Sequence, residues 1–270
     1  MILPTLLITF ITILQEPSAV MTHLDIPYAG PDSDPVHQVL DVFAPPDASD
    51  LPVVFFIHGG AFHMSDKSDA EYYPETGFRF AVEGWVTVLP NYRLSPAVQY
   101  PEHARDIAAA LRWTIEHIDR YGGDPGNVFV SGHSAGGFLA AAVVLDESFL
   151  RDIGGNTDGV RGVIPICGQF EVVDEGRQET FGTAPDRWPG FSPLNHIRAD
   201  APPFLILEAV RDDWWAPGQA EVFHDRLKGA GGVSAFHDLD HDHFTIIREL
   251  GLPGDPTMEI IGDFIRRFRR

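Results

Sequence analysis

Short apolar runs alternate with segments of helical spacing along most of the chain. Four continuous runs of β-branched and aromatic residues predict strands that are buried on both faces. They span residues 52–57, 85–89, 127–131 and 204–207. Four segments between or after them are predicted to be helices: residues 77–83, 101–120, 137–145 and 219–228. This alternation predicts an α/β fold whose strands are parallel and joined by right-handed crossovers.

The remaining segments are less regular. Residues 37–43 alternate as a half-buried edge strand does, residues 160–167 predict a further strand, and residues 256–270 predict an amphipathic helix with a basic end. Residues 168–200 mix Phe and Trp with Gly and Pro. This composition is typical both of a lid over an active-site cleft and of a packed connecting loop, so both interpretations stay open.

Length, charge and cysteine content limit the number of domains and the kinds of partner that this chain can have. The 270 residues contain no internal repeat or long linker, so we expect residues 21–270 to form a single domain. The formal net charge of -20 argues against nucleic acid and anionic membrane surfaces as partners and favours small neutral molecules. Cys167 is the only cysteine, which excludes an intramolecular disulfide and any metal site built from several cysteines.

The first twenty residues stand apart from the rest. Residues 1–14 are apolar, too short for an ordinary membrane span, and carry no Lys or Arg ahead of the apolar run. We interpret residues 1–20 as an apolar leader or a non-native extension, with Met21 as an alternative start. No stable membrane span is expected. The predicted location is cytoplasmic, or secreted or membrane-anchored if the leader is genuine.

The strongest candidate for chemistry is the sequence Gly132-His-Ser-Ala-Gly136, which fits the pattern G-x-S-x-G. In this pattern a serine sits on a sharp turn between a buried strand and a helix. The two glycines let strand and helix approach closely while the backbone is strained at Ser134. The strand over residues 127–131 and the helix over residues 137–145 supply that context. Ser134 is therefore the predicted nucleophile.

A second glycine-containing turn follows the strand over residues 52–57, in His58-Gly-Gly-Ala-Phe62. Attack on an ester or amide carbonyl places negative charge on oxygen, and preorganised backbone N–H groups stabilise that charge. We expect an oxyanion hole built from the amides of Gly60, Ala61 and Ala135. The alternative is an ordinary glycine-rich connection between a strand and a helix.

A serine nucleophile needs a base, and the base needs a carboxylate that sets its tautomer. The sharp turn at Ser134 is of the kind called a nucleophile elbow. In proteins with this elbow the catalytic residues follow along the chain in the order serine, acid, histidine. Asp212 has the better offset after the strand over residues 204–207, and Asp213 is the alternative. His243 is the predicted base and His241 the alternative. A metal site at these histidines and the neighbouring aspartates is a further interpretation, although an adjacent run seldom converges on one ion.

Other residues near these motifs are interpreted structurally. His133 is expected to shape the elbow. His58 is expected to order, by hydrogen bonding, the loop that begins at His58-Gly-Gly-Ala-Phe62, here called the oxyanion loop. Cys167 is expected to be a buried apolar residue. A set of tryptophans is expected either to line an apolar pocket or to fill the core or lid. It comprises Trp188, Trp214 and Trp215.

Taken together, these motifs resemble the esterase and lipase branch of the α/β-hydrolase superfamily. The likeness covers roughly residues 37–270 and rests on four strings in the same order: His58-Gly-Gly-Ala-Phe, Asn91-Tyr-Arg-Leu-Ser-Pro, Tyr121-Gly-Gly-Asp-Pro-Gly-Asn and Gly132-His-Ser-Ala-Gly-Gly. The resemblance implies an α/β-hydrolase fold with a mostly parallel central sheet, helices on both faces and a small lid or insertion. It also implies the triad Ser134, Asp212 and His243.

Carboxylesterases and feruloyl-esterase-like enzymes share this general pattern, which implies hydrolysis of small carboxylic esters through an acyl-enzyme, without cofactor or metal. Kynurenine formamidases also carry a string such as Asp66-Lys-Ser-Asp69, so an arylformamidase acting on a formamide is the alternative. A non-catalytic binding protein on a hydrolase scaffold is the rival from another class. The sequence makes no prediction of oligomeric state.

Overall fold

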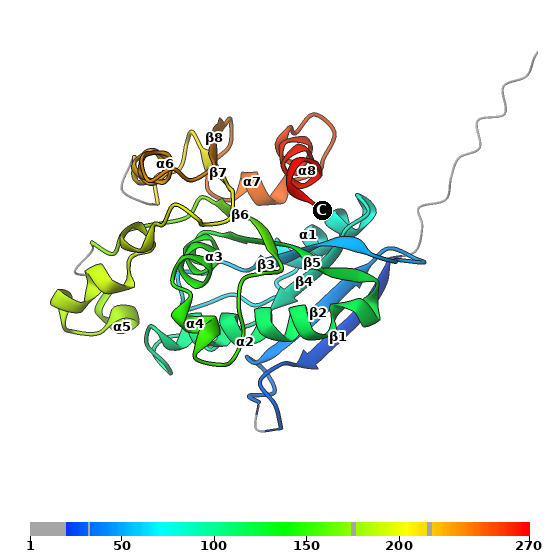
Figure 1. The fold of residues 1–270 in the computed structure, drawn as a ribbon, viewed down its shortest axis with the longest axis horizontal. Coiled ribbons are helices and arrows are strands. Elements are labelled where there is room, and N and C mark those ends of the chain that lie inside the picture. Colours follow the sequence, from blue (N-terminus) through cyan, green and yellow to red (C-terminus); the bar gives the residue numbers. More distant parts are fainter. Residues whose placement is uncertain (1–19, 32, 174–176, 215–217) are drawn as a thin grey trace, which may run out of the picture.

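The strands form one eight-stranded sheet, shown in Figure 1. The computed structural model describes residues 20–31, 33–173, 177–214 and 218–270. The strand order across the sheet is β1-β2-β4-β3-β5-β6-β7-β8. In chain order the strands are β1 (Met21–Pro27), β2 (Val39–Ala44), β3 (Leu51–Ile57), β4 (Val86–Pro90), β5 (Gly123–His133), β6 (Val160–Ile166), β7 (Phe204–Ala209) and β8 (Ser234–Leu239).

Six of these strands, β3 to β8, are mutually parallel, as the alternation of strands and helices predicts. Phe56 pairs with Ser131 and Ile57 with Gly132, so the carboxyl ends of β3 and β5 lie side by side. Loops that follow parallel strands emerge at one edge of a sheet, where α/β proteins place their sites. The oxyanion loop after β3 and the elbow after β5 are therefore neighbours.

The prediction of an edge strand over residues 37–43 is wrong. β2 lies inside the sheet because it pairs with β1 on one edge and β4 on the other, both antiparallel. It is buried at all six positions, and its side chains belong to the cores on both faces of the sheet. β1 itself is the strand at this edge of the sheet and is largely exposed. Its polar pattern carries no periodic signal, so the sequence alone did not predict it.

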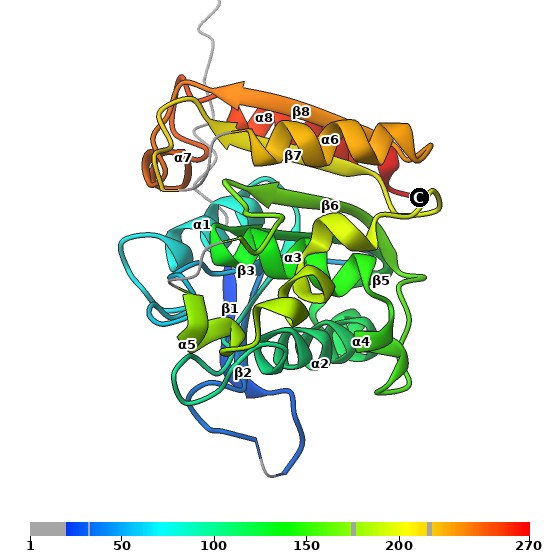
Figure 2. The same ribbon diagram turned by 90° about the vertical axis from the view of Figure 1, so that its left-hand side faces the viewer.

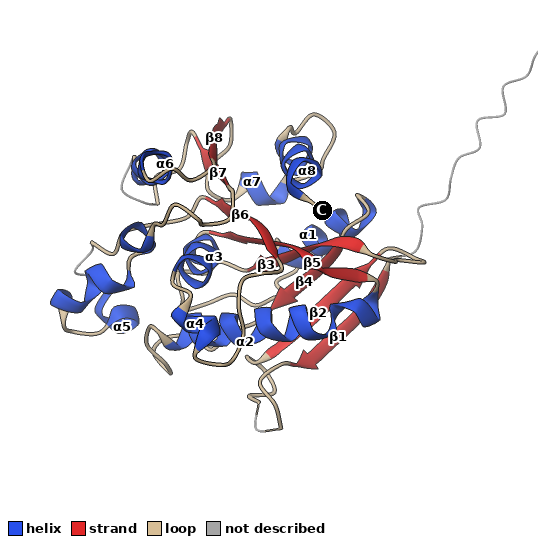
Figure 3. Ribbon diagram, in the orientation of Figure 1, coloured by secondary structure: helices blue, strands red, loops and turns tan. Residues whose placement is uncertain are grey.

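Helices cover both faces of the sheet, as Figures 2 and 3 show. They are α1 (Tyr73–Val82), α2 (Glu102–His117), α3 (Ala135–Leu145), α4 (Ser148–Arg151), α5 (Gln178–Phe181), α6 (Gln219–Gly229), α7 (Thr245–Arg248) and α8 (Thr257–Phe268). Side chains of α2, α3 and α6 belong to the apolar core on one face. Side chains of α1, α7 and α8 belong to the core on the other.

Residues 177–200 form a layer of short helical turns beside α3. Besides α5 it contains the 3₁₀ helices η3 (Pro185–Phe191) and η4 (Pro193–His196). Phe181 is buried and packs against Phe62 and Phe138. The Nε2 atom of His63 lies 2.9 Å from the Thr180 hydroxyl. The layer therefore contacts the oxyanion loop, and its action as a lid stays a prediction.

Candidate active site

Ser134 stands at the turn between β5 and α3, with backbone angles φ 57° and ψ -119°. A non-glycine residue with positive φ is strained, and such strain is concentrated at functional sites. Glycine makes the turn sterically feasible. A Cβ atom at Gly132 would lie 2.4 Å from the Gly136 carbonyl oxygen, and one at Gly136 would lie 2.1 Å from that of Ile57. Strand and helix can approach this closely only without those side chains.

The structure brings Ser134, His243 and Asp212 into one hydrogen-bonded chain. The Ser134 Oγ atom lies 2.9 Å from His243 Nε2, and His243 Nδ1 lies 2.6 Å from Asp212 Oδ2. All three side chains are buried. Because a carboxylate only accepts, His243 Nδ1 carries the proton donated to Asp212, and the unprotonated Nε2 accepts the serine hydroxyl proton.

The environment keeps Asp212 ionised. Burial works to raise the pKa of its carboxyl group, but hydrogen bonds from His243 and from the Trp214 amide outweigh burial and lower the pKa below its ordinary value. The Trp214 amide nitrogen lies 2.9 Å from Asp212 Oδ1, and the Cys167 thiol also hydrogen-bonds to this carboxylate. Cys167 was expected only to fill space, and no sequence signal indicated this contact.

The alternative acid and base lie elsewhere. Asp213 is exposed to solvent. His241 is buried, but its Nε2 atom lies 3.0 Å from Asp255 Oδ1, so it ties its loop to the segment that precedes α8. Neither residue belongs to the hydrogen-bonded chain at Ser134.

The oxyanion loop has a strained backbone. Gly60 has φ +105°, Ala61 has φ 53° and Phe62 has φ 68°. A Cβ atom at Gly60 would lie 1.9 Å from the Met64 carbonyl oxygen, so this position accepts only glycine. The amides of His63 and Met64 both donate to the Gly60 carbonyl. Across the described part of the chain, the amides of Gly60 and Ala61 donate to no protein group, which leaves them available to a ligand.

His58 orders this loop in the way its position predicts. Its Nδ1 atom lies 2.8 Å from the Gly59 carbonyl oxygen, and its ring stacks on Tyr92 with centroids 4.4 Å apart. Burial lowers the pKa of His58 to about 4, so the imidazole is neutral at physiological pH.

The string Asp66-Lys-Ser-Asp69 anchors the oxyanion loop to the sheet. The Lys67 ammonium lies 2.8 Å from Asp41 on β2 and 2.7 Å from Asp25 on β1. The Lys67 amide donates to Asn91 Oδ1 at 2.6 Å, and Asn91 Nδ2 donates to Asp66 at 2.6 Å. These contacts give the string a structural role at the base of the loop.

The tryptophans differ in environment. Trp188 is buried and its indole donates to the Phe181 carbonyl at 3.2 Å, so it belongs to the core of its layer. Trp214 is 55% exposed and stacks on His243 with ring centroids 5.5 Å apart. Trp215 lies outside the described residues. Trp214 is therefore the aromatic side chain of this set that stands at the triad.

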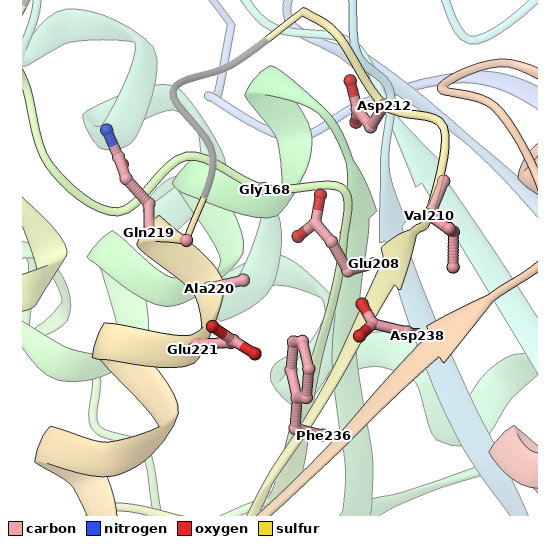
Figure 4. Close-up of a pocket in the computed structure, with 11 residues that line it drawn as sticks. Gly168, Glu208, Val210, Asp212, Gln219, Ala220, Glu221, Phe236 and Asp238 are labelled. Carbon is pink, nitrogen blue, oxygen red and sulfur yellow. The ribbon is translucent and has the colours of Figure 1, made fainter.

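A cavity of about 220 Å³ lies behind Asp212, between β7, β8 and α6. Figure 4 shows the side chains of Glu208, Asp212 and Asp238 around it. Burial, together with the charges of Asp212 and Asp238, raises the pKa of Glu208 to about 8. Since carboxylates dominate its polar lining, the cavity does not suit an apolar acyl chain.

One group of side chains has metal-ligating atoms close together within the described ranges. One ligand atom each from Cys167, Asp212 and His243 lies within 4.8 Å of the others. Both imidazole nitrogens of His243 already face hydrogen-bonding partners, and burial raises the pKa of the Cys167 thiol. A protonated thiol is a poor ligand. The donor set therefore fits a hydrogen-bonded triad better than a metal centre.

Comparison with known proteins assigns this chain to a family. A family model described as BD-FAE matches residues 40–227. The chain belongs to the BD-FAE family. This family lies within the α/β-hydrolases, so the resemblance drawn from the four strings is confirmed.

Named relatives of this BD-FAE chain are esterases. The esterase LipQ of Mycobacterium tuberculosis is 27% identical over 89% of this chain and 61% of its own length. The probable carboxylic ester hydrolase LipM of the same organism is 32% identical over 70% of this chain and 48% of its own length. The chain thus spans about half to three fifths of the length of these two relatives.

Solved structures show the same fold. A truncated carbohydrate esterase from gut microbiota superposes with a TM-score of 0.79 and 19% identity, covering 94% of this chain and 98% of that one. Esterase B from Lactobacillus Rhamnosis has a TM-score of 0.78 and 19% identity, covering 94% and 86%. The predicted α/β-hydrolase fold is therefore confirmed. Within the described ranges, no helix combines the length and apolar character needed to cross a membrane.

Proposed function

We propose that this chain is a serine carboxylic ester hydrolase that cleaves small esters through an acyl-enzyme on Ser134. The observation that carries the proposal is the buried chain Ser134–His243–Asp212, with contacts of 2.9 and 2.6 Å. A non-catalytic binding protein has no need of a strained serine aligned with a base and an acid. The esterase names of the relatives support the same reaction class.

In the first half-reaction, His243 Nε2 removes the Ser134 hydroxyl proton as Oγ forms a bond to the ester carbonyl carbon. The carbonyl π electrons move onto oxygen, and the amides of Gly60, Ala61 and Ala135 are proposed to stabilise this charge. The bond from carbon to the alkoxy oxygen then breaks, and His243 returns its proton to that oxygen. The alcohol leaves and the acyl group stays on Ser134.

In the second half-reaction, water replaces the serine hydroxyl as the attacking group. His243 removes a proton from water, the oxyanion forms again, and the bond from carbon to Ser134 Oγ breaks. The proton returns to Ser134 and the carboxylic acid is released. Asp212 holds the imidazole in one tautomer and stabilises its cationic form throughout.

The formamidase alternative has no independent support. The relatives described above are named as esterases, and Asp66-Lys-Ser-Asp69 serves as an anchor of the oxyanion loop. We expect kcat/KM to be higher for short p-nitrophenyl esters than for N-formylkynurenine. A marked preference for the formamide would transfer the proposal to arylformamidase.

Ser134→Ala is the matching control for every substrate. Removing the nucleophile of a serine triad lowers kcat by about 10⁶-fold in a well-studied protease, and a loss of similar size is expected here with the folded state retained. Unchanged ester hydrolysis by this variant would contradict the proposal. The cytoplasmic location also remains a prediction, to be tested by cell fractionation.

A further inference from the structure

A second hydrogen-bonded chain joins the oxyanion loop to the backbone of the triad histidine. The Gly59 amide nitrogen lies 2.9 Å from the Tyr73 hydroxyl, which lies 3.3 Å from His133 Nδ1. His133 Nε2 in turn lies 2.7 Å from the His243 carbonyl oxygen. We propose that Tyr73 and His133 are positioning residues that hold the oxyanion loop and His243 in one fixed relation around Ser134. This inference rests on the proposed function.

The groups at the two ends of this chain, an amide and a carbonyl, fix the direction of every hydrogen bond between them. The Gly59 amide only donates, so the Tyr73 oxygen accepts there and gives its own proton to His133 Nδ1. The His243 carbonyl only accepts, so His133 Nε2 must carry the ring proton. The four groups are thus satisfied in a single arrangement, with His133 as the neutral tautomer protonated at Nε2.

Burial makes this arrangement costly to break. Tyr73 is 3% exposed, His133 is 2% exposed and His243 is 3% exposed. A buried donor or acceptor that loses its partner cannot turn to water instead. Burial, reinforced by the charge of His243, lowers the pKa of His133 to about 3. His133 therefore stays neutral and does not compete with His243 for the serine proton.

Close contacts at Gly59 tie the same elements together. A Cβ atom there would lie 2.9 Å from the His133 carbonyl oxygen, 3.1 Å from Ser134 Cβ and 3.1 Å from the Tyr73 hydroxyl. The oxyanion loop, the elbow and α1 thus meet at one glycine. A displacement of any of them would shift the oxyanion donors relative to the nucleophile.

A double-mutant cycle tests whether Tyr73 and His133 act as one unit. Tyr73→Phe removes only the hydroxyl, and His133→Leu removes both ring nitrogens at similar volume. Because small misplacements at a reacting centre are costly, each single variant should lower kcat for a p-nitrophenyl ester by about 10- to 100-fold. KM should change by less than about twofold, since ground-state binding is untouched.

The double variant should lose no more kcat than the worse single variant, because either substitution already breaks the chain. Losses that multiply, or losses confined to KM, would overturn the proposal. Tyr92→Phe is the matched control. Its hydroxyl also reaches this loop, at 3.2 Å from the His58 carbonyl oxygen, but it lies outside the chain. Any effect of Tyr92→Phe should therefore multiply with that of His133→Leu.

NMR of protein carrying ¹⁵N-labelled histidine tests the proton arrangement without any turnover. The His133 ring should remain neutral, with its proton on Nε2, from about pH 5 to about pH 9. A proton on Nδ1, or titration within that range, would overturn the proposal even in an active enzyme. Conversely, the expected spectrum in a protein without ester hydrolysis would refute the proposed function and leave the hydrogen-bonded chain standing.

Discussion

Asp212 and Asp213 are adjacent in sequence but have different environments. The Asp212 carboxylate is buried and accepts hydrogen bonds from His243 Nδ1 and the Trp214 amide, whereas Asp213 faces solvent. The offset after β7 favoured Asp212 without deciding between them. Only Asp212 lies where it can accept hydrogen bonds from His243, which is 31 positions away, and the pattern around β7 carries no signal for that contact.

Asp212→Asn should separate the role of charge from that of shape. The amide keeps the volume of the carboxylate but no longer fixes the imidazole with its proton on Nδ1. In a serine protease the same substitution lowers kcat by about 10⁴-fold, and we expect a loss of that order. Steady-state kinetics with a p-nitrophenyl ester measures it. Asp213→Asn is the matched control and should retain parental kcat; equal losses in both variants would contradict the assignment.

Glu208 makes stability depend on pH. Its pKa rises from an ordinary value of 4.5 to about 8 on folding, because of burial and the charges of Asp212 and Asp238. Between these values the folded state binds a proton that the unfolded state has lost. The free energy of unfolding contributed by this group therefore falls as pH rises from 4.5 to about 8.

Glu208→Gln replaces the carboxyl group by a neutral group of similar shape and removes this dependence. Its Tm should exceed that of the parent at about pH 9 and match it at about pH 5, since the acid is protonated there in the folded state. Thermal unfolding followed by circular dichroism gives both values. Glu259→Gln, at an exposed position of α8 away from this cavity, should follow the parent. The same Tm difference at both pH values would refute the explanation.

At the scale of elements, the elbow depends on how closely α3 approaches β3 and β5. The space that a Cβ atom at Gly136 would need is occupied by the Ile57 carbonyl oxygen, 2.1 Å away. This carbonyl oxygen belongs to the backbone of β3. A clash between it and an added Cβ atom could therefore be relieved only if a strand or the helix moved.

Gly136→Ala should therefore reduce the free energy of unfolding by about 3 kcal/mol or more, the upper range for overpacking. Gly229→Ala in α6 is the matched control, because a Cβ atom there meets nothing within 4 Å. Its stability should be equal to the parent or slightly higher. Urea denaturation measures both, and similar stabilities for the two variants would show that the elbow tolerates a side chain.

The ion pair of Lys67 with Asp41, which anchors the oxyanion loop to the sheet, is buried. The side chains of Lys67 and Asp41 are 5% and 6% exposed. A buried charge left without its partner is strongly destabilising, whereas removal of both charges costs much less.

Lys67→Met should thus reduce the free energy of unfolding by about 3–5 kcal/mol. The double variant Lys67→Met with Asp41→Asn should recover a substantial part of that loss. Lys228→Met, at an exposed position on α6, is the control and should be close to neutral. If the double variant were less stable than Lys67→Met alone, the stranded charge would not be the cause.

At the scale of the whole molecule, parallel strands bring distant segments together. The oxyanion loop follows β3, Ser134 follows β5, Asp212 follows β7 and His243 follows β8. β3, β5 and β7 were recognisable as continuous apolar runs, whereas no strand was predicted over the residues of β8. The elbow was recognisable because its glycines are required by local backbone geometry. The apolar runs and the elbow glycines could be predicted because both are determined by residues adjacent in the sequence.

The parts that the sequence did not predict depend on contacts between distant residues. β1 is a strand because it pairs with β2, although its own pattern is polar and exposed. Tyr73 and His133 are sixty positions apart, and neither carries a local signal for the other. The contact of Cys167 with Asp212 likewise appears only when β6 and β7 lie side by side.

Reaction of the parent protein with a fluorophosphonate, followed by intact-mass and peptide mass spectrometry, tests directly whether Ser134 is the nucleophile. An activated serine should take up one phosphonyl group per chain, located on Ser134, with ester hydrolysis lost in parallel. Ser134→Ala should remain unlabelled. A folded parent that stays unlabelled, or a label on another residue that abolishes activity, would contradict the account of Ser134 as the nucleophile.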